Sequence, residues 1–253
     1  MPPRRHVVAT LRAAGCVFAE DEAALLLAAT DDPAELDALV ARRVAGEPLE
    51  HLLGWVEFCG LRIAVSPGVF VPRRRTEALV EQAVARARPR AVVVDLCCGS
   101  GAVGAAIAVA VPGIELHAAD VDPAAVACAR ANLSAAAVHE GDLFAALPVE
   151  LRGRIDVLAA NAPYVPTSAI GLMPPEARYH EPPLALDGGG DGLAVLRRIV
   201  AGAPDWLARG GALLFETGTA QVPDAVAALR AAGLAPLIVQ DDERGATVVV
   251  GTR

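Results

Sequence analysis

Hydrophobic positions follow one pattern in a short first part of this chain and another in the long remainder. Residues 20–29 and 33–46 carry apolar side chains at helical spacing, and Asp31-Asp32-Pro33 is a typical helix start. We therefore expect residues 4–46 to form helices. Between residues 49 and 72, aromatic and β-branched residues are interrupted by Gly and Pro, which predicts a β-hairpin that links these helices to the rest.

In the second part, apolar runs alternate with amphipathic segments. Residues 73–87 are predicted to form a helix. Strands are then expected at residues 91–96, 114–120, 136–144, 155–161, 211–218, 235–242 and 246–253, with helices between most of them. Strands separated by helices indicate a parallel, doubly wound α/β sheet, to which the final pair can add an antiparallel edge.

Composition narrows the class of protein. The chain has 253 residues, of which 54% are hydrophobic, so it can bury a substantial core as one large domain or as one ordinary domain with a small one. Its formal net charge is -8. Because proteins that bind nucleic acid in bulk are usually basic, this acidity argues against DNA or RNA as the main partner.

Cysteine and histidine usage points to no metal and no disulfide framework. The five cysteines (Cys16, Cys59, Cys97, Cys98 and Cys128) form no CxxC pair, and the five histidines are scattered. The basic start is interrupted by Arg12, so we expect no signal peptide, and no apolar run reaches membrane-spanning length. We expect a cytoplasmic, monomeric protein with reduced thiols, no membrane association and no metal.

A glycine-rich turn follows the first predicted strand of the sheet. It reads Asp95-Leu96-Cys97-Cys98-Gly99-Ser100-Gly101 and opens a helix, at the sheet edge where open α/β folds bind ligands. The glycines let the backbone approach a nucleoside cofactor, but their spacing also satisfies a dinucleotide fingerprint or a purely structural turn. Asp95 favours a cofactor with a cationic amino-acid end, because its carboxylate would repel a pyrophosphate. The predicted cofactor contacts are Asp95, Cys97, Cys98, Gly99, Ser100 and Gly101.

Two further strand ends carry acidic residues. Asp120 ends the second strand of the sheet, about 20 residues beyond the glycines, where a carboxylate can accept both ribose hydroxyls. Asp122 precedes Pro123 and is better explained as a helix cap. Asp142 could read an adenine amino group and Leu143 could cover the ring, although Asp142 equally suits an ordinary turn.

The tetrapeptide Asn161-Ala162-Pro163-Tyr164 follows the fourth strand, at the same edge as the glycine-rich turn. The Asn161 oxygen and the Ala162 carbonyl can accept the two N–H bonds of a planar amine or carboxamide. Tyr164 can stack on that planar group, and Pro163 stiffens the turn. Together with the cofactor turn, this motif predicts methyl transfer from S-adenosylmethionine to a planar nitrogen by positioning. Alone, the motif would equally suit a loop after a strand.

With both motifs placed, the chain resembles the HemK/PrmC family of protein-(glutamine-N5) methyltransferases, which modify the GGQ glutamine of peptide-chain release factors. The resemblance covers nearly the full length, from GEPLEHLLGW through DLCCGSGAVG, AADVDP and NAPYVP to EARYHEPPLALDGGGDG. It implies a class I (Rossmann-like, seven-stranded) methyltransferase domain over residues 73–253. Residues 1–72 would form a helical substrate-recognition domain with a linking β-hairpin.

The resemblance also implies roles for individual residues. Asn161 and Tyr164 would be catalytic and would bind the substrate with Ala162 and Pro163, while Asp120, Asp142, Leu143 and again Asn161 would contact the cofactor. Two departures stand out: Ala162 replaces the second residue of the usual NPPY, and the Arg74-Arg75 pair stands where the family has a proline and a carboxylate.

Two charged features outside these motifs have competing explanations. Arg73-Arg74-Arg75 could bind RNA or an acidic partner, but a solvated loop and helix start is the favoured interpretation. Glu181 lies in the long loop after the tetrapeptide. It could approach the substrate or simply be a surface acid.

The leading hypothesis is therefore a protein-glutamine N5-methyltransferase that acts on a release factor or another glutamine-containing translation protein. A nucleic-acid amino-methyltransferase of the adenine N6 type would share the chemistry, but it should carry a basic groove. A cofactor-binding paralogue without turnover is a third hypothesis, prompted by Ala162 alone. A dehydrogenase is the weakest, because it leaves the tetrapeptide without a purpose.

Overall fold

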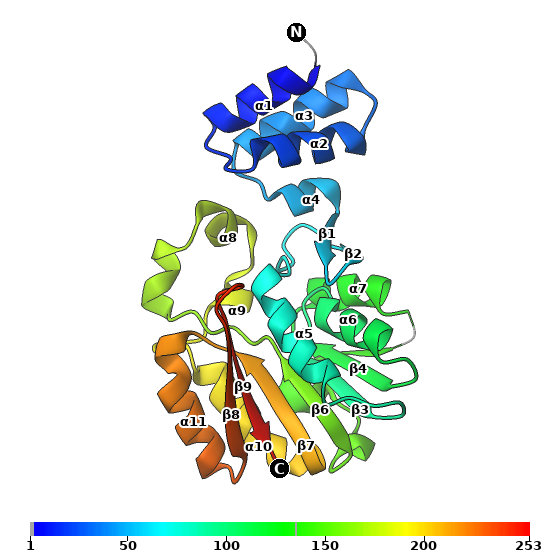
Figure 1. Ribbon diagram of the computed structural model, residues 1–253, viewed down its shortest axis with the longest axis vertical. Helices are drawn as coiled ribbons and strands as arrows, with labels where there is room; N and C mark the ends of the chain where they lie inside the picture. The colour runs from blue at the N-terminus through cyan, green and yellow to red at the C-terminus, as the bar shows by residue number, and fades with distance from the viewer. Residues whose placement is uncertain (1–2, 135) are drawn as a thin grey trace.

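The first part of the chain forms a small helical unit at one end of the molecule (Figure 1). The computed structural model describes residues 3–134 and 136–253. Its first helices are α1 (Pro3–Ala13), α2 (Ala19–Ala29) and α3 (Pro33–Val44). As predicted, Asp32 and Pro33 begin α3: Asp32 caps the helix, and its carboxylate accepts a hydrogen bond of 2.9 Å from the Ala34 N–H. The three helices share a small core centred on residues such as Leu11 and Leu26, which are fully buried.

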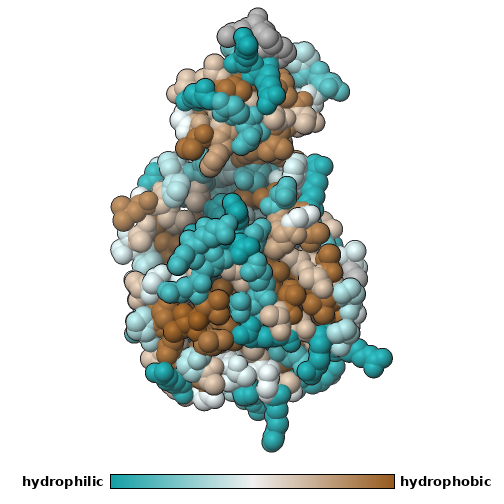
Figure 2. Space-filling view, viewed as in Figure 1, coloured by the Kyte–Doolittle hydropathy of each residue, from teal (hydrophilic) through white to brown (hydrophobic). Residues whose placement is uncertain are grey.

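A short linker joins this unit to the sheet, and the molecular surface narrows there (Figure 2). It contains α4 (Leu49–Leu53), β1 (Trp55–Phe58) and β2 (Leu61–Ala64), and the two strands pair antiparallel. The predicted hairpin is confirmed, but its predicted span is too long at both ends. Residues 49–53 form α4 instead of a strand. Gly54 ends this helix in the left-handed conformation, with a φ of 76°.

Seven strands form one sheet in the order β5-β4-β3-β6-β7-β9-β8. They are β3 (Val92–Leu96), β4 (Glu115–Asp120), β5 (Ala137–Glu140), β6 (Ile155–Ala160), β7 (Leu207–Glu216), β8 (Ala235–Asp241) and β9 (Ala246–Thr252). The first five strands run parallel, and β9 runs antiparallel between β7 and β8. The predicted parallel sheet with an antiparallel pair at one edge is therefore confirmed.

Helices cover both faces of the sheet (Figure 1). They are α5 (Glu77–Val84), α6 (Ala102–Ala110) and α7 (Pro123–Asn132) on one face, and α10 (Ala194–Trp206) and α11 (Val222–Ala231) on the other. Successive strand residues point to opposite faces of the sheet. Val93 and Val157 pack in the core under α5, α6 and α7, and Val94 and Leu158 pack in the core under α10 and α11. Burial on both faces explains why these strands read as continuous apolar runs.

A long segment between β6 and α10 contains the 3-10 turn η4 (Thr167–Leu172) and the short helices α8 (Pro175–His180) and α9 (Pro183–Leu186). Arg43 of α3 ties this segment to the helical unit, since its guanidinium lies 2.6 Å from Glu176 and 2.7 Å from Glu22. Other 3-10 turns are η1 (Arg74–Thr76), η2 (Leu143–Ala146), η3 (Val149–Leu151) and η5 (Thr219–Gln221). Within the described ranges, no helix has the length and hydrophobicity needed to span a membrane.

The Asn132 side chain fastens the linker hairpin to the sheet domain through three hydrogen bonds. Asn132, the last residue of α7, accepts a hydrogen bond from the Ala64 N–H and donates to the Ala64 carbonyl, each 2.9 Å long. Its amide also donates to the Ser100 carbonyl in the glycine-rich turn at 2.9 Å. Asn132 therefore holds the hairpin and the turn together.

We predict that Asn132→Ala lowers the free energy of unfolding by about 1–3 kcal/mol, because the Ala64 N–H and the Ser100 carbonyl lose a partner and the Ala64 carbonyl keeps only the Cys128 thiol. Urea unfolding would measure the loss, and hydrogen exchange at the Ala64 amide would show faster local opening. Asn132→Asp keeps the acceptor but turns a carboxylate oxygen toward the Ala64 and Ser100 carbonyls, so it should lose at least as much. An unchanged unfolding midpoint and unchanged exchange in Asn132→Ala would contradict this role.

Candidate active site

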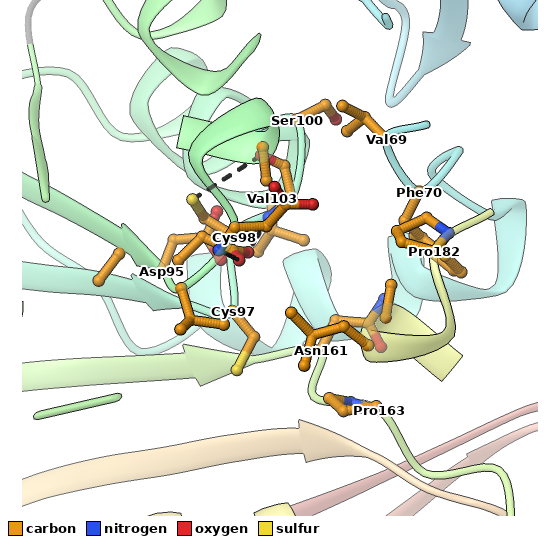
Figure 3. Close-up of a pocket in the computed structure, with 18 of the residues that line it drawn as sticks. Val69, Phe70, Asp95, Cys97, Cys98, Ser100, Val103, Asn161, Pro163 and Pro182 are labelled. Carbon is orange, nitrogen blue, oxygen red and sulfur yellow. Dashed lines mark hydrogen bonds between the residues drawn. The ribbon is translucent and has the colours of Figure 1, made fainter. Parts of the chain in front are cut away.

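A cavity of about 170 Å³ opens at the carboxyl ends of β3, β4 and β6 (Figure 3). This is the point where the strand order reverses, because β4 and β5 lie on one side of β3 while β6 lies on the other. In Figure 3, Asp95, Cys98 and Ser100 form one side of the cavity, Phe70 and Pro182 lie opposite, and Asn161 closes the base. Segments predicted separately from the sequence thus meet around one space.

The turn between β3 and α6 depends on unusual backbone angles. Cys97 has a φ of 58°, which is costly for a residue with a side chain, and Gly101 has a φ of 78°. Gly101 has a second requirement, because a Cβ there would lie 2.8 Å from Cδ1 of Leu133. Among the predicted cofactor contacts, Gly101 alone does not line the cavity; it shapes the turn whose neighbours do.

Asp95 lines the cavity but is almost entirely buried, with 1% of its surface exposed. Its carboxylate accepts a hydrogen bond of 2.8 Å from the Gly104 N–H. Burial raises the pKa of Asp95 to about 7, and the nearby Asp120 adds to the rise while the Gly104 bond opposes it. A cation placed in the cavity would favour the ionised form.

Asp120, at the end of β4, faces the same cavity. Its carboxylate accepts hydrogen bonds from the Gly99 N–H at 2.9 Å and the Asp122 N–H at 3.0 Å. Burial raises its pKa, against the effect of those N–H groups. Each carboxylate oxygen keeps a free lone pair, so the pair of oxygens suits a diol. Asp122 caps α7 by accepting from the Ala124 N–H, which confirms its predicted role.

Asp142 and Leu143 also line the cavity, on the turn after β5. Leu143 takes a φ of 49°, so the backbone is strained there. Asp142 is exposed and its carboxylate lies 2.5 Å from the guanidinium of Arg198 on α10. Sequence reasoning missed Arg198, which gave no signal beyond its place on an amphipathic helix.

The charge of the residues that line the larger cavity indicates which cofactor fits there. Five lining residues are aspartates (Asp95, Asp120, Asp122, Asp142 and Asp187), whereas Arg198 is the one arginine or lysine in the described lining. Such a wall would repel a dinucleotide pyrophosphate and attracts a cation. The Ser100 hydroxyl is buried and has no hydrogen-bond partner within the described residues, so it is available to a ligand. The lining therefore fits S-adenosylmethionine, with a sulfonium, an ammonium and a diol, and not a nicotinamide cofactor.

A smaller cavity of about 40 Å³ adjoins the first on the far side of Asn161. Asn161 and Pro163 line both cavities, while Ala162 and Tyr164 line only the smaller one. The tetrapeptide therefore stands between a space for a cofactor and a space for a second, small group. The Asn161 amide donates a long hydrogen bond, 3.4 Å, to the Thr76 hydroxyl.

Tyr164 is held by charged neighbours. Its hydroxyl donates to Glu216 at 2.6 Å, and the guanidinium of Arg75 lies 5.8 Å from the ring centroid. Burial, followed by the negative charge of Glu216, raises the pKa of the Tyr164 phenol. The phenol therefore stays neutral, and an acid–base role for Tyr164 is unnecessary.

The structure corrects the interpretation of two charged features. Arg73 and Arg75 are not simply solvated: Arg73 pairs with Glu181 at 2.6 Å and Arg75 with Glu216 at 2.8 Å. Glu181 is no surface acid, because it is 4% exposed and also accepts from the Val71 N–H. Glu216 was missed as a site residue, although its position at the end of a predicted strand was a usable signal.

Comparisons with known proteins identify relatives of this chain. A family model described as Methyltransferase small domain matches residues 60–172. The chain is 39% identical over 229 residues to a release factor glutamine methyltransferase of Geobacter sulfurreducens, covering 88% of this chain and 80% of that protein. It is 42% identical over 228 residues to one of Mycolicibacterium smegmatis, with coverages of 82% and 80%.

Two further comparisons concern a relative named for a different substrate and a solved structure with a similar fold. The chain is 38% identical over 205 residues to a 4-amino-L-phenylalanine/4-methylamino-L-phenylalanine methyltransferase of Streptomyces pristinaespiralis, covering 77% of this chain and 69% of that protein. A methyltransferase structure from Pyrococcus furiosus superimposes with a TM-score of 0.58 at 16% identity, covering 76% of this chain and 89% of that one. The predicted class I methyltransferase fold is thereby confirmed. No cluster of potential metal ligands occurs in the part of the chain that the structure describes.

We predict that affinity for S-adenosylmethionine rises between pH 6 and pH 8, because Asp95, with a pKa of about 7, becomes a carboxylate over that range. Asp95→Asn should weaken binding at pH 8 by roughly tenfold, the effect of one pKa unit, and should flatten this part of the pH profile. Calorimetric titration at both pH values measures it. In the unliganded protein the same raised pKa means that the stabilising effect of the protonated form is lost as the pH rises through about 7.

Asp122→Asn is the matched control for that experiment. It changes a carboxylate in the same cavity wall to an amide, and asparagine caps a helix as well as aspartate does. Its pH profile should follow the wild type. A wild-type affinity that does not change with pH, or an Asp95→Asn profile as steep as the wild type, would contradict the role of Asp95.

Proposed function

This chain belongs to the release factor glutamine methyltransferase family, and from that premise we propose that it methylates the side-chain amide nitrogen of a glutamine in a peptide-chain release factor. The glutamine we expect is the one in the GGQ motif. S-adenosylmethionine supplies a methyl group activated by its sulfonium. We expect the enzyme to act in the cytoplasm as a monomer.

The observation that carries this proposal is the position of Asn161 between the two cavities. A cofactor in the larger cavity and a carboxamide in the smaller one would meet at this residue. The Asn161 side-chain oxygen and the Ala162 carbonyl are the two acceptors proposed for the N–H bonds of the substrate amide. With both N–H bonds held, the nitrogen lone pair can be aimed along a fixed line.

The chemistry asked of the protein is alignment. The amide nitrogen forms a bond to the methyl carbon while the carbon–sulfur bond breaks, and one N–H proton then leaves to solvent. Because an amide nitrogen is a poor nucleophile, fixing its direction is the main contribution available to the protein. Tyr164 packs against the planar amide, and its raised pKa keeps the phenol uncharged beside the developing charge.

An aromatic amine is the second candidate substrate, because the Streptomyces pristinaespiralis relative is named as an aminophenylalanine methyltransferase. Its nitrogen is planar and carries two N–H bonds, like an amide. The size of the smaller cavity, about 40 Å³, favours a carboxamide over a phenyl ring. The acidic lining of the larger cavity and the net charge of -8 oppose a nucleic-acid substrate.

We further propose that residues 1–72 recognise the protein substrate and that residues 73–253 carry out methyl transfer. The core shared by α1, α2 and α3 supports such a division, as does the narrow linker. Val17 and Phe18 expose 83% and 68% of their surface on this helical unit, which offers apolar contacts to a protein.

Methyl transfer from labelled S-adenosylmethionine tests the substrate directly. The acceptors to compare are a purified release factor, the same factor with its GGQ glutamine changed to alanine, 4-aminophenylalanine, and total RNA. We expect label on the unaltered factor only. Label on the amino acid or on RNA would replace the proposed substrate, and label on none of the four would refute it.

We predict that Asn161→Ala slows methyl transfer by at least about 100-fold, because one of the two acceptors that align the nitrogen is gone. Affinity for S-adenosylmethionine should change by less than about threefold, since the cofactor's charged groups face other residues. Single-turnover kinetics and calorimetry measure the two effects separately. A matching loss of rate and of cofactor affinity would contradict the substrate role of Asn161.

A further inference from the structure

Glu216 lies at the carboxyl end of β7, beside the strand that leads to Asn161. The two strands are parallel, and Phe215 pairs with Ala160 in their register, so the next residues of each chain emerge side by side. Glu216 is 4% exposed. A buried carboxylate needs hydrogen-bond donors, and this one lines the smaller cavity.

Three donors surround the Glu216 carboxylate. The Thr76 hydroxyl donates to Oε2 at 2.8 Å. The Tyr164 hydroxyl donates to Oε1 at 2.6 Å, and the Arg75 Nε–H donates to the same oxygen at 2.8 Å. An ionised carboxylate can only accept, so all three hydrogen bonds have a fixed direction. Arg75 also balances the charge.

The direction of the hydrogen bond from Thr76 to Glu216 determines how the Asn161 amide is oriented. A threonine hydroxyl has a single proton, and Thr76 gives it to Glu216. Its oxygen is then an acceptor toward any other neighbour, and it accepts from Nδ2 of Asn161 at 3.4 Å. With the NH2 group turned to Thr76, the oxygen edge of the Asn161 amide is the one left for a ligand.

We propose that Glu216 is a positioning residue which, through Thr76, fixes the Asn161 amide with its oxygen toward the substrate nitrogen. This inference rests on the proposed function, since it names what orients the acceptor of that site. Glu216 also fixes the hydroxyl of Tyr164, which lines the same smaller cavity. One carboxylate thereby orders both side chains of the tetrapeptide that face the substrate.

The charge state of residue 216 decides the orientation. In Glu216→Gln, the new NH2 group can donate to Thr76, whose proton is then free to turn toward Asn161. The Asn161 amide can reverse, and its NH2 group would face the N–H bonds of the substrate. Two donors facing each other would misalign the nitrogen without disturbing the cofactor, whose carboxylate partners lie elsewhere in the larger cavity.

Four variants distinguish this positioning role of Glu216 from a purely structural one. Glu216→Gln allows the Thr76–Glu216 hydrogen bond to reverse, Thr76→Val removes the hydroxyl between Glu216 and Asn161, and Thr76→Ser keeps that hydroxyl. Glu181→Gln is the matched control: Glu181 has the same exposure and also pairs with an arginine, but it lines neither cavity. Thermal unfolding of all four reports the cost of each change to stability.

The first readout is the side-chain amide resonance of Asn161, followed by NMR in the unliganded protein. We expect Glu216→Gln and Thr76→Val to shift this resonance and to speed exchange of its protons, while Thr76→Ser and Glu181→Gln leave it in place. An Asn161 resonance that is unchanged in both of the first two variants would overturn the proposal. This readout needs no substrate, so it decides the proposal even if the proposed function fails.

The second readout is methyl transfer to the release factor. We expect Glu216→Gln and Thr76→Val to lower kcat by about 10- to 100-fold, with KM and the Kd for S-adenosylmethionine changed by less than about threefold. Thr76→Ser should restore most of the rate. Equal rates in wild type, Glu216→Gln and Thr76→Val would overturn the proposal, whereas a wild-type protein that modifies no release factor would refute the proposed function instead.

Discussion

Parallel pairing of β3 with β6 is the constraint on which the site depends. Leu96 at the end of β3 is paired with Ala160 at the end of β6, so the next residues, Cys97 and Asn161, leave the sheet at the same edge. Because strand order reverses between these two strands, helices cover the faces and leave the space beyond their ends open. Cofactor turn and substrate turn are far apart in sequence, yet this pairing makes them neighbours. The proposed reaction then depends on the conformations of these two turns.

Buried carboxylates provide the charged groups of the two cavities, and these carboxylates differ in their hydrogen-bond partners. Asp95 has a single backbone N–H as partner and its pKa rises to about 7, which leaves it ready to receive a cation. Asp120 takes two backbone N–H groups. Glu216 is paired with an arginine and two hydroxyls, so it is fully partnered without a ligand. The larger cavity therefore attracts positive charge, while the smaller one presents fixed hydrogen-bonding groups to a neutral amide.

The fold could be predicted from the sequence because the strands are buried on both faces and read as continuous apolar runs bounded by turn residues. The part of the larger cavity that lies on the strand-end turns could be predicted, because those turns carry glycines and acidic residues at recognisable spacing, whereas Phe70, Pro182 and Arg198 come from segments with no such signal. The place of Glu216 at a strand end could be predicted, but its contacts with Arg75 and Thr76 could not, since they join segments about 140 residues apart and no local pattern encodes them. Gly101 was assigned to the cofactor on spacing alone, whereas its place against Leu133 shows a steric requirement of the turn.

A crystal structure with S-adenosylhomocysteine and a GGQ-containing peptide would show whether Asn161 aligns the glutamine amide. We expect the glutamine carboxamide in the smaller cavity, with its nitrogen within hydrogen-bonding distance of the Asn161 side-chain oxygen and the Ala162 carbonyl and facing the cofactor sulfur. A peptide whose glutamine lies outside this cavity, or whose nitrogen meets the Asn161 NH2 group, would contradict this alignment.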